Sequence, residues 1–181
     1  MFIQTEATPN PSTLKFLPGK PVLADGTADF RSSSDAASSP LAARLFDIDG
    51  VNGVFLGSDF ISVTKGDIEW PHLKPMVLGA IMEHYIAGDA ATGANDESEE
   101  TFDPADADTV ATIKELLETR VRPAVAQDGG DITFSAFRDG VVYLHMRGAC
   151  SGCPSSTATL RHGIENLLKH FCPDVQGVQA V

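Results

Sequence analysis

The sequence contains few cysteines, and this sets a first limit on its class. Three cysteines in 181 residues are too few for a small secreted scaffold built on disulfides. A reducing compartment is therefore expected. Hydrophobic residues make up 43% of the chain, charged residues 21% and aromatic residues 7%. These values are typical of an ordinary soluble chain rather than of a disordered or fibrous one.

Long apolar runs and clusters of basic residues are also absent. The longest apolar stretches, such as residues 76–82, are too short to cross a bilayer. No basic segment followed by an apolar stretch stands at the N-terminus, so no secretory signal is visible. The net charge is −12. It argues against general binding to nucleic acid or to anionic membranes, because phosphate contacts need lysine and arginine.

The acidic charge is concentrated in the middle of the chain. Residues 1–88 hold 6 basic and 10 acidic residues, residues 89–108 hold none and 8, and residues 109–181 hold 7 of each. The middle segment has one aromatic residue and no periodicity, so it cannot bury enough apolar area to offset its ordering entropy. We predict two domains, 1–88 and 109–181, joined by a flexible acidic linker over 89–108. An acidic docking segment is the alternative for the linker.

The first 88 residues show the turn and capping signals of a small α+β domain. Two hairpins are expected, formed by residues 2–6 with 13–17 and by residues 51–56 with 60–64. Between them, residues 24–39 form a polar connection. Ser39 is the predicted N-cap of a short helix that begins at Pro40. A longer helix is expected after residues 70–71, with Gly88 just past its end.

No cluster in this first domain indicates catalysis. His72 and His84 lie on the predicted long helix without a neighbouring cysteine, so they are expected at the surface or hydrogen-bonded in the core. Trp70 is the predicted aromatic anchor of the core. The sequence assigns this domain no chemistry.

The last 73 residues predict the order helix, strand, strand, helix, strand. The first helix opens near Asp108 as its N-cap and ends or kinks at Pro123. The adjacent glycines at 129–130 indicate backbone angles closed to other residues, or a backbone approached closely by another group. Residues 139–140, Asp-Gly, predict a two-residue hairpin. The predicted fold class is α+β, with two small α+β domains joined by the acidic flexible linker.

Cys150 and Cys153 are the candidate site of this second domain. Two cysteines with two residues between them can bind one metal centre or form one disulfide. Pro154 suits the first position of a helix, which puts Cys153 at or beside the N-cap, where the helix dipole lowers a thiol pKa. Arg147 is expected to add positive potential, and flanking glycines leave room for a bulky ligand.

Four interpretations of this pair compete. A structural zinc site needs four ligands, and the chain offers one such pair. A thioredoxin-like redox pair normally follows a strand in a βαβ unit, whereas this one follows a hairpin. A purely structural role, as buried thiols or as one disulfide, is disfavoured because a short segment flanked by glycines packs poorly. The fourth interpretation is an iron–sulfur cluster.

The number of cysteine ligands indicates how an iron–sulfur cluster could be bound. Iron–sulfur clusters are usually bound by about four thiolates. Two chains related by a two-fold axis would supply them, two from each chain. A cluster held between subunits is easily released, which suits a carrier. Cys172 is the rival ligand, but it lies roughly 25 Å away along the following helix. It is expected to be a small packed hydrophobic residue.

Two groups of residues resemble a known family. Residues 127–131, Gln-Asp-Gly-Gly-Asp, and 147–154, Arg-Gly-Ala-Cys-Ser-Gly-Cys-Pro, resemble the C-terminal domain of the NifU family. Residues 4–16, Gln-Thr-Glu-Ala-Thr-Pro-Asn-Pro-Ser-Thr-Leu-Lys-Phe, and 18–22, Pro-Gly-Lys-Pro-Val, resemble the Nfu-type N-terminal domain. Together they are similar to a full-length Nfu iron–sulfur carrier of the mitochondrial and α-proteobacterial type.

The resemblance implies a carrier of a [4Fe–4S] cluster, with [2Fe–2S] as the alternative, and not an enzyme. Cys150 and Cys153 are its implied ligands, in a homodimer when the cluster is bound. The implied partners are upstream iron–sulfur assembly proteins and recipient apoproteins, with the N-terminal domain contributing to these contacts. No nucleic acid or membrane partner is expected. De novo cluster assembly is not expected, because the scaffold and ferredoxin-like domains of the longer NifU proteins are missing.

The sequence also indicates a cellular location and leaves two alternative functions open. Because the Nfu-type motif begins at Met1, no transit peptide is expected, which indicates the bacterial cytoplasm or, alternatively, a mature form in the mitochondrial matrix. The alternative function is a thiol–disulfide oxidoreductase that uses the same cysteine pair. A third is an interaction adaptor that acts through the N-terminal domain.

Overall fold

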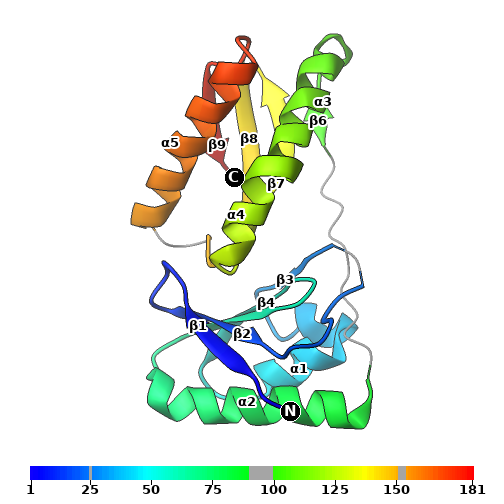
Figure 1. Cartoon of the computed structure of the whole chain (residues 1–181), viewed down its shortest axis with the longest axis vertical. Helices are drawn as coiled ribbons and strands as arrows, with labels where there is room; N and C mark the ends of the chain where they lie inside the picture. The colour runs from blue at the N-terminus through cyan, green and yellow to red at the C-terminus, as the bar shows by residue number, and fades with distance from the viewer. Residues whose placement is uncertain (25, 90–99, 151–153) are drawn as a thin grey trace. The chain divides into compact units, whose positions relative to one another are not determined.

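The computed structural model describes residues 1–24, 26–89, 100–150 and 154–181 (Figure 1). Contacts between residues divide the chain into two compact units, Met1–Asp96 and Glu97–Val181. Each unit combines a β-sheet with helices, so the predicted α+β class is confirmed. Among the helices of the described residues, none combines the length and the apolar character that crossing a membrane requires.

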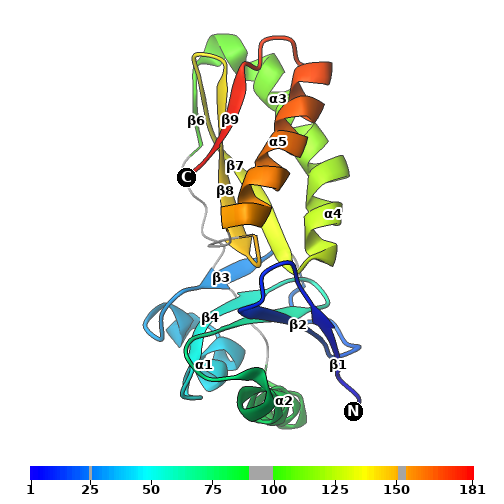
Figure 2. The same cartoon turned by 90° about the vertical axis from the view of Figure 1, so that its left-hand side faces the viewer.

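The N-terminal unit is an antiparallel sheet covered by two α-helices. The strand order is β1-β2-β5-β4-β3, and Figures 1 and 2 show α1 and α2 on one face of the sheet. The strands are β1 Gln4–Ala7, β2 Thr13–Leu17, β3 Ala28–Phe30, β4 Val51–Leu56 and β5 Ile61–Lys65. The helices are the short 3₁₀ helix η1 Asp35–Ser38, α1 Pro40–Phe46 and α2 Trp70–Ala87.

Capping residues and turn residues in the sequence correctly predicted most of these elements. The hydroxyl of Ser39 accepts a hydrogen bond from the N–H of Ala42 at 3.3 Å, and α1 begins at Pro40, as predicted. Gly88 follows α2 in the left-handed conformation, with φ at 72°, which favours glycine. Both predicted hairpins are present, as β1–β2 and β4–β5.

Strand β3 is an element that the sequence analysis missed. It lies inside the stretch predicted to be a polar connection and pairs antiparallel with β4. Its outer two residues, Ala28 and Phe30, are buried in the core. Three residues carry too little alternation to be recognised as a strand, and only pairing with β4 makes this one.

Trp70 packs at the edge of the first core. Its ring centroid lies 6.5 Å from that of the fully buried Phe16. Its indole N–H donates a hydrogen bond to the carbonyl of Pro11 at 3.1 Å. Trp70 is partly buried against the core and ties the first turn of α2 to the β1–β2 connection.

The C-terminal unit is a mixed four-stranded sheet with helices on one face (Figure 2). The order is β6-β7-β8-β9, with β7 and β8 antiparallel and the two edge strands parallel to their neighbours. The strands are β6 Thr101–Phe102, β7 Gly130–Arg138, β8 Val141–Gly148 and β9 Gly177–Ala180. The helices are η2 Pro104–Asp106, α3 Ala107–Leu116, the π-helical turn η3 Leu117–Val121, α4 Arg122–Gln127 and α5 Pro154–Phe171.

The last part of the predicted linker is structured. Thr101 and Phe102 form β6 and pair with Ala136 and Phe137 of β7. The ring centroid of Phe102 lies 6.3 Å from that of Phe134. The one aromatic side chain of the acidic segment therefore anchors it to the second unit. Helix α3 begins at residue 107 with Asp106 as its N-cap, so the predicted cap at residue 108 was wrong.

Pro123 stands at the start of a helix, not at the end of one. The helical path continues from α3 through the π-helical turn η3 into α4, and Pro123 occupies the first turn of α4. Proline has no N–H to donate to the preceding turn, and the hydrogen-bond pattern changes to that of the π-helical turn η3 directly before α4. Of the two predicted outcomes, an end or a kink, the helix end is wrong, because the helical path continues. The predicted hairpin at 139–140 is confirmed: both residues have positive φ, 50° and 79°, between β7 and β8.

His84 differs from its prediction. It is 1% exposed, and its Nδ1 atom has no hydrogen-bond partner among the described residues. Burial lowers its pKa from 6.5; Asp89 opposes this shift and Arg44 adds to it. The ring packs edge-on to Tyr85, with centroids 5.4 Å apart.

Acid should therefore weaken the N-terminal unit through His84. Unfolded His84 takes up a proton near pH 6.5, whereas native His84 takes one up only at lower pH. Its contribution to stability is complete above pH 6.5 and is lost as the pH falls toward the lowered native pKa. Urea unfolding between pH 5 and pH 8 measures this slope. We expect His84→Leu to reduce the slope and the exposed control His72→Leu to preserve it; equal slopes in all three chains would contradict the account.

Candidate functional site

The loop after β8 carries Cys150 onto a glycine pair at the start of β7. A Cβ atom added to Gly130 would lie 2.5 Å from Sγ of Cys150 and 2.9 Å from the carbonyl oxygen of Arg147. Gly129 has a positive φ of 79°, and its carbonyl accepts a hydrogen bond from the N–H of Ala149 at 3.2 Å. Both reasons predicted for the two glycines are confirmed, one at each position.

Only one of the two predicted ligands is described. Cys150 is 6% exposed and belongs to the hydrophobic core of the C-terminal unit. Cys153 lies outside the described residues. Helix α5 begins at Pro154 as predicted, so Cys153 directly precedes the helix in the sequence.

The electrostatics around Cys150 differ from the expectation of an activated thiolate. Burial, with a smaller contribution from the carboxylates of Asp128 and Asp131, raises the pKa of the Cys150 thiol to about 12. Arg147, expected to add positive potential, is 9% exposed and lies opposite Asp131 in the β7–β8 ladder. The thiol is therefore protonated in this state, and binding a metal centre would release its proton.

An ion pair ties α4 to the strand that carries Gly130. Nε and Nη2 of Arg122 donate to the two carboxylate oxygens of Asp131 at 2.8 and 2.9 Å. Asp131 is 3% exposed and also accepts a hydrogen bond from the N–H of Ile132 at 2.8 Å. The bidentate geometry is the strong form of this contact. Sequence reasoning identified the segment of Asp131 but missed Arg122, because no local pattern links the two positions.

Cys172 lies at the other end of α5. It is 5% exposed and packs in the core with Leu168, whose carbonyl accepts its N–H at 2.6 Å. This agrees with the prediction of a packed residue. Within the part of the chain that the structure describes, no group of three or more histidine, cysteine, aspartate or glutamate side chains could hold a metal ion.

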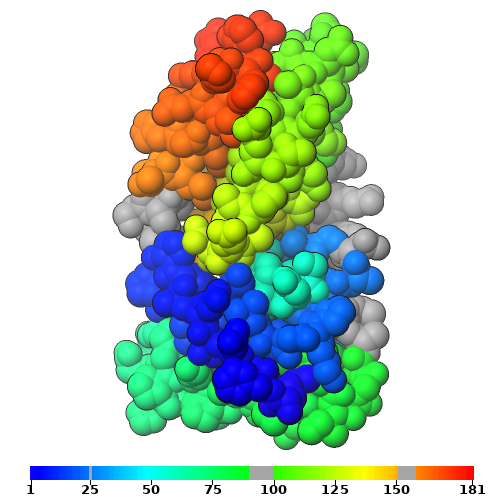
Figure 3. Space-filling model, viewed as in Figure 1, coloured from blue at the N-terminus to red at the C-terminus, as the bar shows by residue number. Residues whose placement is uncertain are grey.

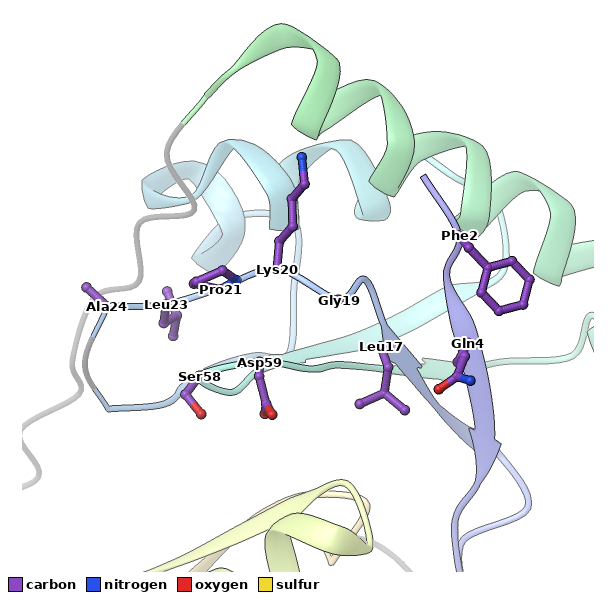
Figure 4. A pocket seen from close by; sticks show the side chains of 10 residues that line it. All are labelled: Phe2, Gln4, Leu17, Gly19, Lys20, Pro21, Leu23, Ala24, Ser58 and Asp59. Carbon is purple, nitrogen blue, oxygen red and sulfur yellow. The ribbon is translucent and has the colours of Figure 1, made fainter.

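A hollow of about 720 Å³ lies in the N-terminal unit (Figure 4). Apolar side chains such as Leu17 and Leu23 line it together with Ser58 and Asp59, whereas the side chain of Lys20 points away toward the helices. Its lining contains no cysteine or histidine. It therefore offers none of the soft ligands that iron–sulfur centres use.

Comparison with known proteins defines the class. Residues 3–88 match the family model described as the N-terminal domain of scaffold protein Nfu/NifU, and residues 113–179 match the NifU-like domain. The two units thus define a two-domain scaffold-type protein. The chain belongs to the Nfu/NifU family.

Named relatives match along almost the whole chain. NifU-like protein 5, mitochondrial, of Arabidopsis thaliana is 53% identical over 99% of this chain and 67% of its own length. NifU-like protein 4, mitochondrial, of the same plant is 52% identical over 99% of this chain and 65% of its own length. The human NFU1 iron-sulfur cluster scaffold homolog, mitochondrial, is 48% identical over 100% of this chain and 72% of its own length.

The contact between Gly130 and Cys150 predicts a steric penalty. Gly130→Ala is expected to lower the free energy of unfolding of the C-terminal unit by about 1–3 kcal/mol, because its Cβ overlaps the thiol and the backbone. Urea unfolding followed by circular dichroism measures this change. In the control Gly163→Ala, the Cβ meets no described atom within 4 Å. A control as unstable as Gly130→Ala would refute the steric explanation.

The ion pair between Arg122 and Asp131 predicts a second loss. Asp131→Asn should destabilise the C-terminal unit by about 3 kcal/mol, since it leaves the guanidinium without its buried partner. Arg122 also contacts Glu118, whose side chain is 65% exposed. The control Glu118→Gln should therefore change the free energy of unfolding by about 0.5 kcal/mol or less. Similar small effects of both variants in urea titrations would show that the buried pair is not a major contact.

Proposed function

We propose that this protein carries an iron–sulfur cluster, bound by Cys150 and Cys153, and passes it to recipient apoproteins. The observation that supports this most is the position of Cys150. Its thiol lies against Gly130, where no side chain fits, in a chain of the Nfu/NifU family. The human relative is named an iron-sulfur cluster scaffold homolog, which supports the same cargo here.

The donor set suits an iron–sulfur cluster held between two chains. Thiolates are the usual ligands of these clusters, about four to each. Cys150 and Cys153 provide two, and Cys172 is packed in the core at the far end of α5. A second chain would complete the set in a homodimer. We favour [4Fe–4S] as the cargo, with [2Fe–2S] as the alternative.

The proposed partners follow from carriage. Upstream assembly proteins would donate the cluster and recipient apoproteins would accept it, with the N-terminal domain contributing to these contacts. The relatives bear the names of scaffold and NifU-like proteins, which supports a carrier rather than an enzyme. Their names also favour the mitochondrial location over the bacterial cytoplasm that the sequence analysis placed first.

Replacement of single cysteines tests the proposal. After anaerobic reconstitution with iron and sulfide, the wild-type chain should show the absorption of an iron–sulfur cluster and restore activity to an apoenzyme that needs one. Cys150→Ser and Cys153→Ser should each abolish both properties, because each removes a ligand. The control Cys172→Ala should keep both.

Two outcomes would contradict the proposal. Full cluster loading of Cys150→Ser, or loss of loading in Cys172→Ala, would show that the ligands are assigned wrongly. A cluster-free chain that reduces disulfides at the rate of a thioredoxin would instead support the oxidoreductase alternative.

A further inference from the structure

The hollow of the N-terminal unit has the size and the composition of a binding site (Figure 4). Its volume of about 720 Å³ lies within the roughly 300–1,000 Å³ of typical ligand sites. Leu17 and Leu23 give it apolar walls. The side chains of Gln4, Ser58 and Asp59 add polar groups to the same lining. A few polar groups on an apolar surface are typical of sites that orient and select a ligand.

Hydrogen bonds hold one wall of the hollow in place. The N–H of Val22 donates to the carbonyl of Ser58 at 2.8 Å. The hydroxyl of Tyr85 in α2 donates to the carbonyl of Pro21 at 3.1 Å. These two contacts tie residues 19–24, most of which line the hollow, to the sheet and to a helix. The wall therefore exists without a ligand.

Asp59 gives the hollow its charge. Its lining contains two charged side chains, Lys20 and Asp59. Lys20 points away from the hollow in Figure 4, and its Nζ atom lies 5.9 Å from the ring centroid of Tyr85. No described residue forms an ion pair or a hydrogen bond with the Asp59 carboxylate. Residues 1–88 hold 10 acidic and 6 basic residues, so the surrounding field also favours a cation.

A basic side chain suits this combination of groups. Lysine and arginine carry a positive charge at the end of an apolar stem, and they pack the stem along apolar surface while the charge stays beside polar groups. Leu17 would contact the stem, and the Asp59 carboxylate would accept hydrogen bonds from the cation. An acidic ligand would be repelled by the same carboxylate.

Strand β1 favours a protein as the source of this side chain. Gln4 lines the hollow and belongs to β1, which is the edge strand of the described sheet and pairs with β2. Figure 3 shows the N-terminal residues, in blue, at the surface of their unit. An edge strand offers backbone groups with which an extended peptide can pair. We propose that the hollow binds a lysine or arginine side chain of an extended segment of a partner protein, beside β1.

NMR titration of the isotope-labelled, cluster-free full-length chain tests the proposal. The probe is the blocked peptide Val-Thr-Arg-Thr-Val, whose outer residues favour an extended conformation. We expect saturable shifts of the backbone amides of Leu17, Ser58 and Asp59. The same peptide with citrulline in place of arginine should bind about three- to fivefold more weakly, because citrulline has a similar shape without the charge. Equal affinities for the two peptides, or no saturable shift at these amides, would overturn the proposal.

The variant Asp59→Asn tests which group receives the cation. It should weaken binding of the arginine peptide by about the same factor and leave binding of the citrulline peptide unchanged. A merely structural change in the turn would affect both peptides. Asp67→Asn is the matched control, because Asp67 is an exposed carboxylate of the same unit outside the lining of the hollow, and it should change neither affinity. Undiminished binding of the arginine peptide by Asp59→Asn would contradict the proposal.

Two further results would assign the hollow to another occupant and overturn the proposal. Binding of blocked single arginine as tight as that of the peptide would indicate a small cation as the ligand. Shifts of the lining amides that follow the protein concentration alone would indicate a second copy of this chain. The contact needs no cluster and goes beyond the proposed carriage of one, so the titration and the reconstitution of the cysteine variants can fail independently.

Discussion

The contact between the Cys150 thiol and the bare backbone of Gly130 is the constraint on which the site depends. Gly130 begins β7 and pairs with Gly148 at the end of β8, so the thiol loop starts where the hairpin ends. The hydrogen bond from Ala149 to Gly129 holds the loop against the same turn. A side chain at residue 130 would separate the loop from the strand. The Cys150 thiol can therefore occupy this position because residue 130 is glycine and has no side chain.

Charged side chains stabilise the start of β7 and also keep the Cys150 thiol neutral. Arg122 holds Asp131 in two hydrogen bonds and so joins α4 to the first residues of β7. The carboxylates of Asp128 and Asp131 and the burial of Cys150 all raise the pKa of its thiol. The Cys150 thiol is therefore protonated and is not an activated nucleophile. Deprotonation would accompany the arrival of a metal centre.

The sequence predicted the features that depend on neighbours in the chain. Ser39 as a cap, Gly88 after α2, the hairpin at 139–140 and the glycines at 129–130 follow from local backbone requirements. It did not predict β3 or β6, because strands of three and two residues exist only through their pairing with β4 and β7. Arg122 was missed for the same reason: its partner is reached through the fold and not through a sequence motif.

The proposed cluster is shared by two chains, each of which contributes Cys150 and Cys153. Native mass spectrometry of the anaerobically reconstituted full-length protein tests this most directly, because it weighs the protein and its cargo together. The account predicts a species with the mass of two chains and one cluster, absent when Cys150 is replaced by serine. A single chain that holds a complete cluster would contradict it.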